Sequence, residues 1–245
     1  SASMSTNGFM LQQIEPYPGR MFLEANCGPV IRRGLEHAIW ELEYLVKEKG
    51  AKLCKVYQPE DDGPINDRRL WPFYEKAQEL GVPLTLHTGV SYVCPQPNSH
   101  CHPSQLDDVA LAFPELKLIA YHAGWPYTEE LIALCGKHQN LYMSLSGIFG
   151  WYQRSPYRGY HAIGTALQWV PADKIVLGFD LPFDDLPRVT DYIRDLSMPE
   201  ELQEKWGYAQ VTAEDKAQIL GLSLAKLTGI APTTRAKFTA AKPTK

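Results

Sequence analysis

The sequence predicts an α/β fold of the (β/α)8 TIM-barrel type that lacks its first two strands. Three observations predict it. Short β-rich runs alternate with helical stretches about every 30 residues, as parallel strands joined by crossovers require. Several of the strand runs are almost continuously apolar, which is expected when both faces of a sheet are covered. Polar residues gather at or just past the predicted strand ends, where barrels of this type keep their chemistry.

Six segments read as strands, and each is bounded by glycine, proline or a polar cluster. They are expected at residues 20–27, 52–57, 82–87, 116–122, 141–146 and 175–178. A closed barrel of this type has eight strands. Two are therefore missing, and the gap lies at the N-terminus, where the sequence begins inside a predicted helix over Asn7–Ile14.

Helices are predicted between and after these strands. Apolar residues recur at helical spacing after residue 32, and Gly50 provides the stop. Asp67 and Thr212 are suited to N-caps, Pro126 to a first turn, and Gly229 to a position just past a helix end. The expected helices are 32–49, 67–80, 103–113, 126–137, 160–169, 185–195 and 212–227.

The composition fits one soluble domain over residues 4–230, followed by a basic tail over 231–245 that we expect to be disordered. A net charge of -4 gives no reason to expect nucleic acid as a partner. No secretory signal and no apolar run of about 20 residues is present, which argues against a membrane partner. Five cysteines, an odd number, suit reduced thiols. We therefore expect a cytoplasmic protein.

His87, His122 and Asp180 each end or follow a different predicted strand. Taken singly, each histidine could be a hydrogen-bonded core residue, and Asp180 could cap the following turn. Taken together, two imidazoles and a carboxylate at the carboxyl ends of parallel strands are ligand types for zinc or a similar divalent metal. The three residues therefore form the candidate site.

The loop after the strand at 141–146 contains Trp151, Arg154 and Arg158. Aromatic rings and guanidinium groups at this end of the sheet suit a flat or cyclic substrate that carries a carboxylate. Trp125, close to His122, could line the same pocket. The alternative is that these side chains only pack in a solvated loop or under a helix.

The segments LTLHTG, LDDVALAFPELKLIAYHAGWPYTEELIAL, KHQNLYMSLSG and KIVLGFDLPF resemble the amidohydrolase-related family, in the branch of aminocarboxymuconate-semialdehyde decarboxylase. The resemblance runs from about Asn7 to Ile230. It implies a (β/α)8 barrel with one divalent metal, with His87 and Asp180 as ligands and His122 as the residue that orients or activates water or substrate. Lys55 matches a lysine often found at this position, whose role varies.

The sequence departs from the family pattern in three places. The H-x-H or E-x-H motif of the first strand is absent, since the only such pattern, His100-Cys101-His102, lies in a loop after His87. Phe179 replaces the serine or threonine that usually precedes the aspartate. Ser223 stands where an asparagine is common. The first departure removes two expected metal ligands, and the missing strands would leave two sheet edges that a homo-oligomer could cover.

From these features we expect a metal-dependent hydrolase of an ester, lactone or amide bond in a small carboxylated molecule, either aromatic or non-aromatic. The expected cofactor is Zn²⁺, with Mn²⁺ as the alternative. Non-oxidative decarboxylation of an aromatic acid is the second interpretation. A non-catalytic barrel homologue without a complete metal site is the third.

Overall fold

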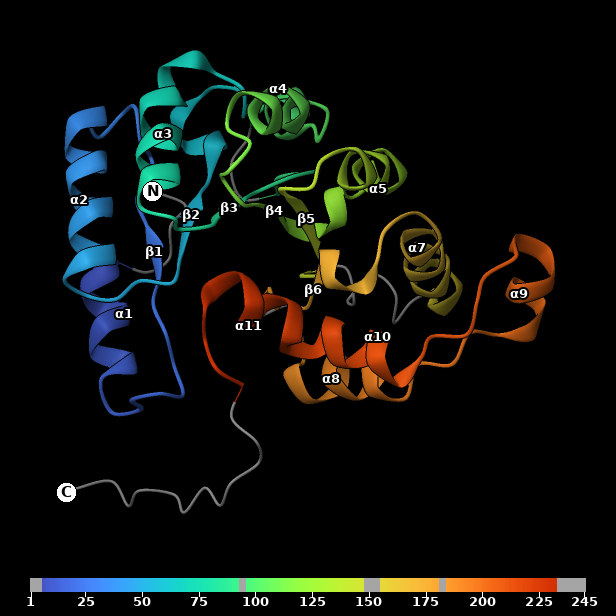
Figure 1. Cartoon of the computed structure of the whole chain (residues 1–245). Helices are drawn as coiled ribbons and strands as arrows, with labels where there is room; N and C mark the ends of the chain where they lie inside the picture. The colour runs from blue at the N-terminus through green and yellow to red at the C-terminus, as the bar shows by residue number, and fades with distance from the viewer. Residues whose placement is uncertain (1–5, 93–95, 148–154, 181–183, 233–245) are drawn as a thin grey trace.

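The computed structural model describes residues 6–92, 96–147, 155–180 and 184–232 (Figure 1). Its six strands form one sheet in the order of the chain, and each neighbouring pair is parallel. The strands are β1 (Glu24–Asn26), β2 (Leu53–Val56), β3 (Leu84–Leu86), β4 (Leu118–Ala120), β5 (Leu141–Ser144) and β6 (Ile175–Val176). The predicted number and parallel direction of the strands are confirmed, and within the described residues β1 and β6 are the two edges.

Helices follow the strands as predicted, and α2, α3, α4, α5 and α7 lie around the outer side of the sheet (Figure 1). They are α1 (Asn7–Ile14), α2 (Leu35–Lys47), α3 (Trp71–Glu79), α4 (Gln105–Ala112), α5 (Thr128–Lys137), α7 (Pro156–Trp169), α8 (Leu186–Arg194), α9 (Glu200–Trp206), α10 (Ala213–Ala217) and α11 (Ser223–Thr228). The predicted caps are present: the Asp67 side chain accepts from the Arg69 N–H, and Thr212 forms a capping box with Asp215.

Three details of the predicted helices are wrong. Pro126 lies before α5, which begins only at Thr128. The single helix expected over 212–227 is interrupted by a π-helical turn at Gln218–Leu222. Helix α9 was not predicted, because Leu202 is its only buried residue and so it has no apolar stripe to recognise.

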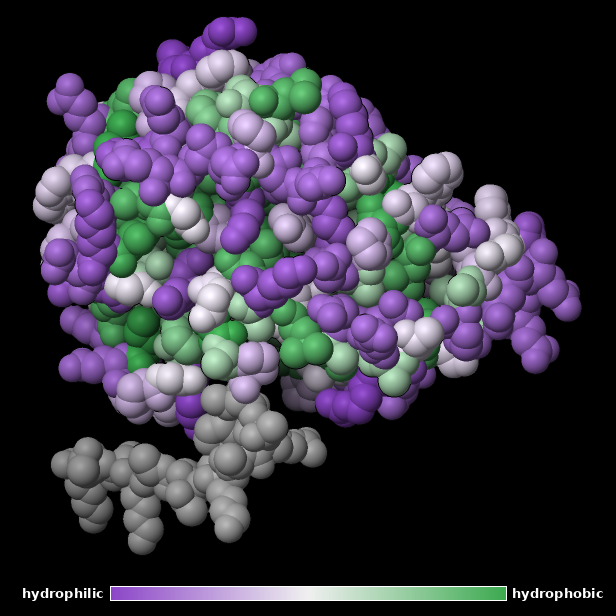
Figure 2. Space-filling view, viewed as in Figure 1, coloured by the Kyte–Doolittle hydropathy of each residue, from purple (hydrophilic) through white to green (hydrophobic). Residues whose placement is uncertain are grey.

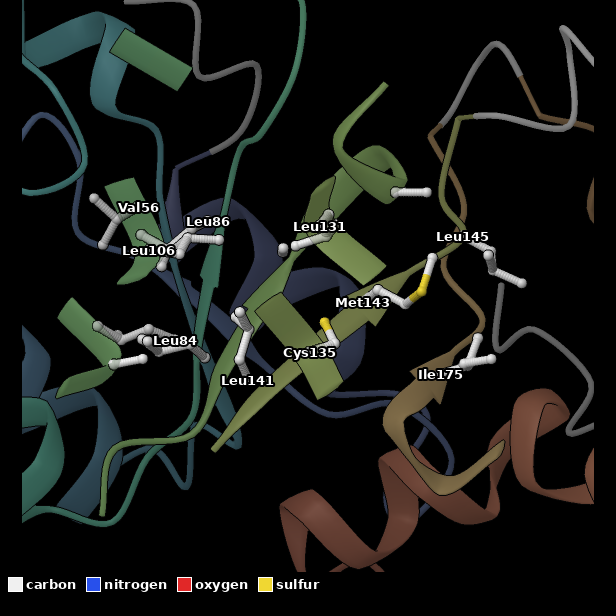
Figure 3. Packing of buried hydrophobic residues seen from close by; sticks show 14 of the residues in the cluster. Val56, Leu84, Leu86, Leu106, Leu131, Cys135, Leu141, Met143, Leu145 and Ile175 are labelled. Carbon is white, nitrogen blue, oxygen red and sulfur yellow. The ribbon is translucent and has the colours of Figure 1, made fainter. Parts of the chain in front are cut away.

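The outer face of the sheet packs against the helices to form the main core. Alternate strand residues point to opposite faces, so one set of positions meets the helices. Figure 3 shows this set meeting side chains such as Leu106 of α4 and Leu131 of α5. The strand members labelled there are Val56, Leu84, Leu86, Leu141, Met143 and Ile175. This core holds the strands in register.

The inner face of the sheet has a smaller apolar cluster of its own. Its strand members come from the alternate positions, and α11 covers them with Leu224 and Leu227. The strand members are Leu53, Ile119, Tyr142 and Val176, with Tyr121 just beyond β4. The last helix of the described chain therefore packs on the inner face, which a barrel fills with side chains from its own strands.

The edge strand β1 is partly covered by a side chain instead of a strand. The Asn7 side chain of α1 accepts a hydrogen bond from the Asn26 N–H (2.8 Å) and donates one to the Asn26 carbonyl (2.9 Å). It also donates to Glu41 of α2 (3.1 Å). An exposed strand edge is prone to pairing with another chain. Asn7 occupies one position of this edge, while the predicted homo-oligomer stays a prediction.

Polar side chains dominate the face seen in Figure 2, with apolar patches between them. Several large apolar residues are exposed on or near α1 and α2, namely Phe9, Tyr17, Met21, Phe22, Trp40 and Tyr44. In the described part of the chain, every helix is too short or too polar to cross a bilayer.

Replacing Asn7 with alanine should lower the free energy of unfolding by about 1–3 kcal/mol, because the Asn26 backbone groups lose their partner while partly buried. Urea denaturation measures this. Gln12→Ala is the control, since Gln12 is exposed on the same helix, and it should change stability by less than about 0.5 kcal/mol. Equal effects of the two substitutions would show that Asn7 does not stabilise the edge.

Candidate active site

The candidate site lies at the carboxyl ends of the strands, on the inner side of the sheet. His87 directly follows β3 and His122 follows β4 by one residue, while Asp180 comes shortly after β6. The imidazole rings of His87 and His122 are 4.6 Å apart between centroids. Parallel strands bring their carboxyl ends to one edge, which is why residues distant in sequence meet here.

His87 is a buried, neutral imidazole. Its side chain is 8% exposed and contacts the ring of Tyr57 edge-on at 4.9 Å. Burial, followed by the neighbouring His122 and the positive charge of Lys55, holds its pKa well below the usual value. Its Nε2 has no hydrogen-bond partner among the described residues. His87 therefore offers an unprotonated ring with an open nitrogen.

His122 is placed by an unusual backbone. It and Ala123 have left-handed torsions, with φ of 60° and 45°. Each non-glycine residue in this region costs roughly 1–2 kcal/mol. The His122 N–H lies 3.3 Å from Ser146 Oγ, and its Nδ1 lies 3.2 Å from the Ser146 carbonyl. When Nδ1 carries the proton and donates to this carbonyl, Nε2 is left as a base.

Asp180 lies beside His122, with Gly147 between them. A Cβ atom added at Gly147 would come within 3.0 Å of His122 Nδ1 and 3.3 Å of Asp180 Oδ2. Gly147 also has a φ of +72°, so glycine is required for both space and conformation. Burial lowers the pKa of His122, the Asp180 carboxylate raises it, and the Lys55 charge lowers it, with a net decrease.

Asp184 belongs to this arrangement, although the sequence did not single it out. Its carboxylate is 4% exposed, and one oxygen accepts from the N–H groups of Gly147 (2.9 Å) and Asp180 (2.7 Å). Its own N–H donates to the Asp180 carbonyl (3.1 Å). Burial raises its pKa despite these donors. Asp184 thereby joins the loops that follow β5 and β6. In the sequence, only the position of Asp184 four residues after Asp180 could have suggested that it supports the site.

Lys55 of β2 faces the same interior. Its Nζ lies 4.5 Å from the centroid of the Tyr121 ring, a cation–π contact. The Tyr121 hydroxyl donates to Glu24 of β1 (2.7 Å), and Thr85 of β3 donates to the same oxygen (2.5 Å). The Glu24 carboxylate on the edge strand is thus hydrogen-bonded to Thr85 of β3 and to Tyr121, one residue beyond β4.

The predicted substrate-binding residues are only partly brought together. The guanidinium of Arg158 lies 5.4 Å from the Trp125 ring, and both line a cavity of about 460 Å³ between α5 and α7. His87, His122 and Asp180 are not among the residues that line this cavity. Trp151 and Arg154 lie outside the described residues.

The described residues fit a divalent metal in donor type but not in donor number. His87 Nε2 is buried and has no hydrogen-bond partner among the described residues, and Asp180 offers a carboxylate close to His122. Zinc requires about four ligands. Across residues 6–92, 96–147, 155–180 and 184–232, no group of three or more His, Cys, Asp or Glu side chains could hold a metal.

Asp184→Ala should speed amide hydrogen exchange at Gly147 and Asp180 by roughly 10- to 100-fold, because both N–H groups lose their acceptor. NMR-detected exchange measures this residue by residue. Asp184→Asn should restore most of the protection, since its amide oxygen can accept both bonds. Asp191→Ala removes only an exposed ion pair with Arg194 and should leave both rates unchanged. Unchanged protection in Asp184→Ala would contradict the role given to Asp184.

The depressed pKa of His87 predicts a pH dependence of stability. The unfolded chain binds a proton at His87 below about pH 6.5, whereas the folded chain does not. The stability of the folded state is therefore retained above the unfolded pKa and falls as the pH drops below it. His87→Gln should reduce the loss of unfolding free energy between pH 7 and pH 5, and His37→Gln, on exposed α2, should not. An NMR titration that shows His87 protonated at pH 6 would contradict this.

A model of the amidohydrolase family matches residues 11–223 of the chain. Dihydroorotase of Helicobacter pylori strain HPAG1 is 34% identical over 107 residues, which are 40% of this chain and 30% of that protein. The dihydroorotase of strain 26695 is 35% identical over 109 residues, 41% of this chain and 30% of that protein. The aligned part thus spans under a third of the length of these relatives.

Solved structures share the fold. The dihydroxybenzoic acid decarboxylase of Polaromonas sp. JS666, with bound manganese, has a TM-score of 0.65 at 19% identity over 91% of this chain and 73% of that one. The 2,6-dihydroxybenzoate decarboxylase of Rhizobium has a TM-score of 0.67 at 15% identity, over 91% and 75%. A TIM-barrel protein of Bordetella bronchiseptica has a TM-score of 0.63 at 21% identity, over 82% and 68%.

These structures identify the open six-stranded sheet as part of a TIM barrel, which confirms the predicted fold class. With the family match over most of its length, the chain belongs to the amidohydrolase family of metal-dependent enzymes.

Proposed function

We propose that this chain carries the active site of a metal-dependent hydrolase that cleaves an ester, lactone or amide bond in a small carboxylated molecule. The observation that supports this most is the state of His122. Its ring is kept neutral, its Nδ1 is directed to the Ser146 carbonyl, and its Nε2 is unbonded among the described residues. Such a ring is a general base.

In this reaction His122 Nε2 would accept a proton from the attacking water and pass it to the leaving oxygen or nitrogen. Asp180 lies beside this ring, and in the metal-free protein its carboxylate raises the pKa of His122 and so favours the imidazolium that forms in between. Asp184 keeps Asp180 and Gly147 in place through two backbone hydrogen bonds. The roles of base, charge stabiliser and support thus come from two loops at one end of the sheet, the loops after β4 and β6.

Zinc is the proposed cofactor, because imidazole and carboxylate are its usual nitrogen and oxygen ligands, and manganese is the alternative. His87 through Nε2 and Asp180 are the proposed protein ligands. A divalent ion there would polarise a substrate oxygen or lower the pKa of water. The remaining donors are not among the described residues, so metal binding by these two residues alone should be weak.

The substrate class follows from the charge of the interior and from the names of related proteins. Lys55 brings a positive charge next to two neutral histidines. Dihydroorotase, and the decarboxylases of dihydroxybenzoic acid, are named for small ring compounds that carry a carboxylate. A compact carboxylated ring is therefore the proposed substrate.

Non-oxidative decarboxylation of an aromatic acid is the second candidate. The structures of two dihydroxybenzoate decarboxylases, each aligned over 91% of this chain, favour it. That reaction needs an acid that protonates carbon after carbon dioxide leaves. The lowered pKa of His122 makes it a poor proton donor near pH 7, and for this reason hydrolysis is the first candidate.

An assay of bond cleavage separates the two reactions. The protein, supplied with Zn²⁺ or Mn²⁺, is incubated with carboxylated aryl esters, lactones and cyclic amides, and in parallel with 2,6-dihydroxybenzoate. We expect acid release from a member of the first group and no carbon dioxide from the second. His122→Gln should lower kcat by roughly 10²- to 10⁴-fold, as expected when a general base is removed.

His37→Gln, which changes an exposed histidine on α2, is the matched control and should retain full activity. Calorimetric titration with Zn²⁺ provides a reading independent of turnover, and His87→Ala should weaken zinc binding. Carbon dioxide release without acid release would replace hydrolysis by decarboxylation. No turnover, combined with zinc binding that His87→Ala leaves unchanged, would identify a non-catalytic homologue.

A further inference from the structure

Lys55 is a partly buried cation without a carboxylate partner in the described part of the chain. Its ammonium lies over the Tyr121 ring at 4.5 Å, and it forms no ion pair within 4.0 Å there. Lys174, which is buried, donates to the carbonyls of His138 (2.8 Å) and Gln139 (2.7 Å). Among the described residues, Lys55 has no such acceptor. A charge removed from water is costly unless something compensates it.

The groups around Lys55 leave its charge available. Its positive charge acts on both His87 and His122, but an imidazole is either neutral or positive, so neither ring can balance it. Glu24 is already the acceptor for the hydroxyls of Tyr121 and Thr85. The Asp180 carboxylate lies beside His122 and forms no ion pair with Lys55 among the described residues. An anion placed over Tyr121 would therefore gain a charge-assisted hydrogen bond without displacing an existing one.

We propose that Lys55 binds the carboxylate of a small aromatic or cyclic acid in the interior of the sheet. The inference rests on the proposed function for its choice of substrate and adds the residue that recognises the charge. The Nζ donates to the carboxylate, and the substrate ring extends toward His87 and His122. The ring of Tyr121, fixed by its bond to Glu24 (2.7 Å), holds the ammonium in position.

Arg158, the other candidate for this role, is less well placed. It is exposed on the first turn of α7, and its guanidinium stacks on Trp125. The cavity that it lines also contains Glu129 and Glu130, which repel an anion. Solvent screens its charge more strongly than that of a partly buried ammonium. Arg158 is therefore a suitable control cation.

The test compares benzoate with benzamide, which have the same ring and nearly the same shape but differ in charge. Dissociation constants come from NMR titration of the purified protein. We expect benzoate to bind wild-type protein roughly 10- to 100-fold more tightly than benzamide, the range of one charge-assisted hydrogen bond. Lys55→Met should abolish this preference and leave benzamide binding unchanged, and Lys55→Arg should retain most of it. Arg158→Met should behave as wild type.

A benzoate preference that survives in Lys55→Met, or that is lost in Arg158→Met instead, would overturn the proposal. So would equal binding of the two probes to wild-type protein. If Lys55→Met does not fold, the shift of the Lys55 side-chain methylene signals on adding benzoate, and not benzamide, gives the same answer in wild-type protein. Probe binding needs no turnover, so a failure of the hydrolase assay leaves this result readable.

Discussion

The structure depends on how an open parallel sheet buries two faces. A closed barrel hides its inner face within itself, but here β1 and β6 are both edges within the described chain. Helix α11 covers part of the inner face with Leu224 and Leu227, and Asn7 covers one position of the β1 edge. Asn26 is the last residue of β1, and Tyr121 in the cluster under α11 lies just beyond β4, so both devices reach the end of the sheet that carries the candidate site.

The alternation of side chains along each strand separates packing from chemistry. On β2, Cys54 and Val56 join the outer core while Lys55 points inward, and on β3, Thr85 lies between two leucines of the outer core. A one-residue shift in register would exchange these roles completely. The positions of Lys55 and Thr85 relative to Glu24 therefore depend on how the helices pack on the outer face of the sheet.

Much of the fold and part of the site could be predicted from the sequence. Apolar runs and caps are local signals, so the six strands and most helices were found. His87, His122 and Asp180 were recognisable because strand ends are visible in a sequence. Asp184 was not, since its importance comes from bonds to two backbone N–H groups of separate loops. The cavity lined by Arg158 and Trp125 likewise depends on how α5 and α7 pack, which no local pattern encodes.

The left-handed backbone at His122 and Ala123 affects which substitutions would stabilise the protein. At residue 122 glycine would relieve the torsional penalty, so the sequence of greatest stability and the sequence with an imidazole at this place differ. Selecting the protein for stability alone would thus tend to replace the imidazole at this position. Glycine at Ala123 would relieve strain without touching the imidazole, but it would also remove a fully buried methyl group from the core.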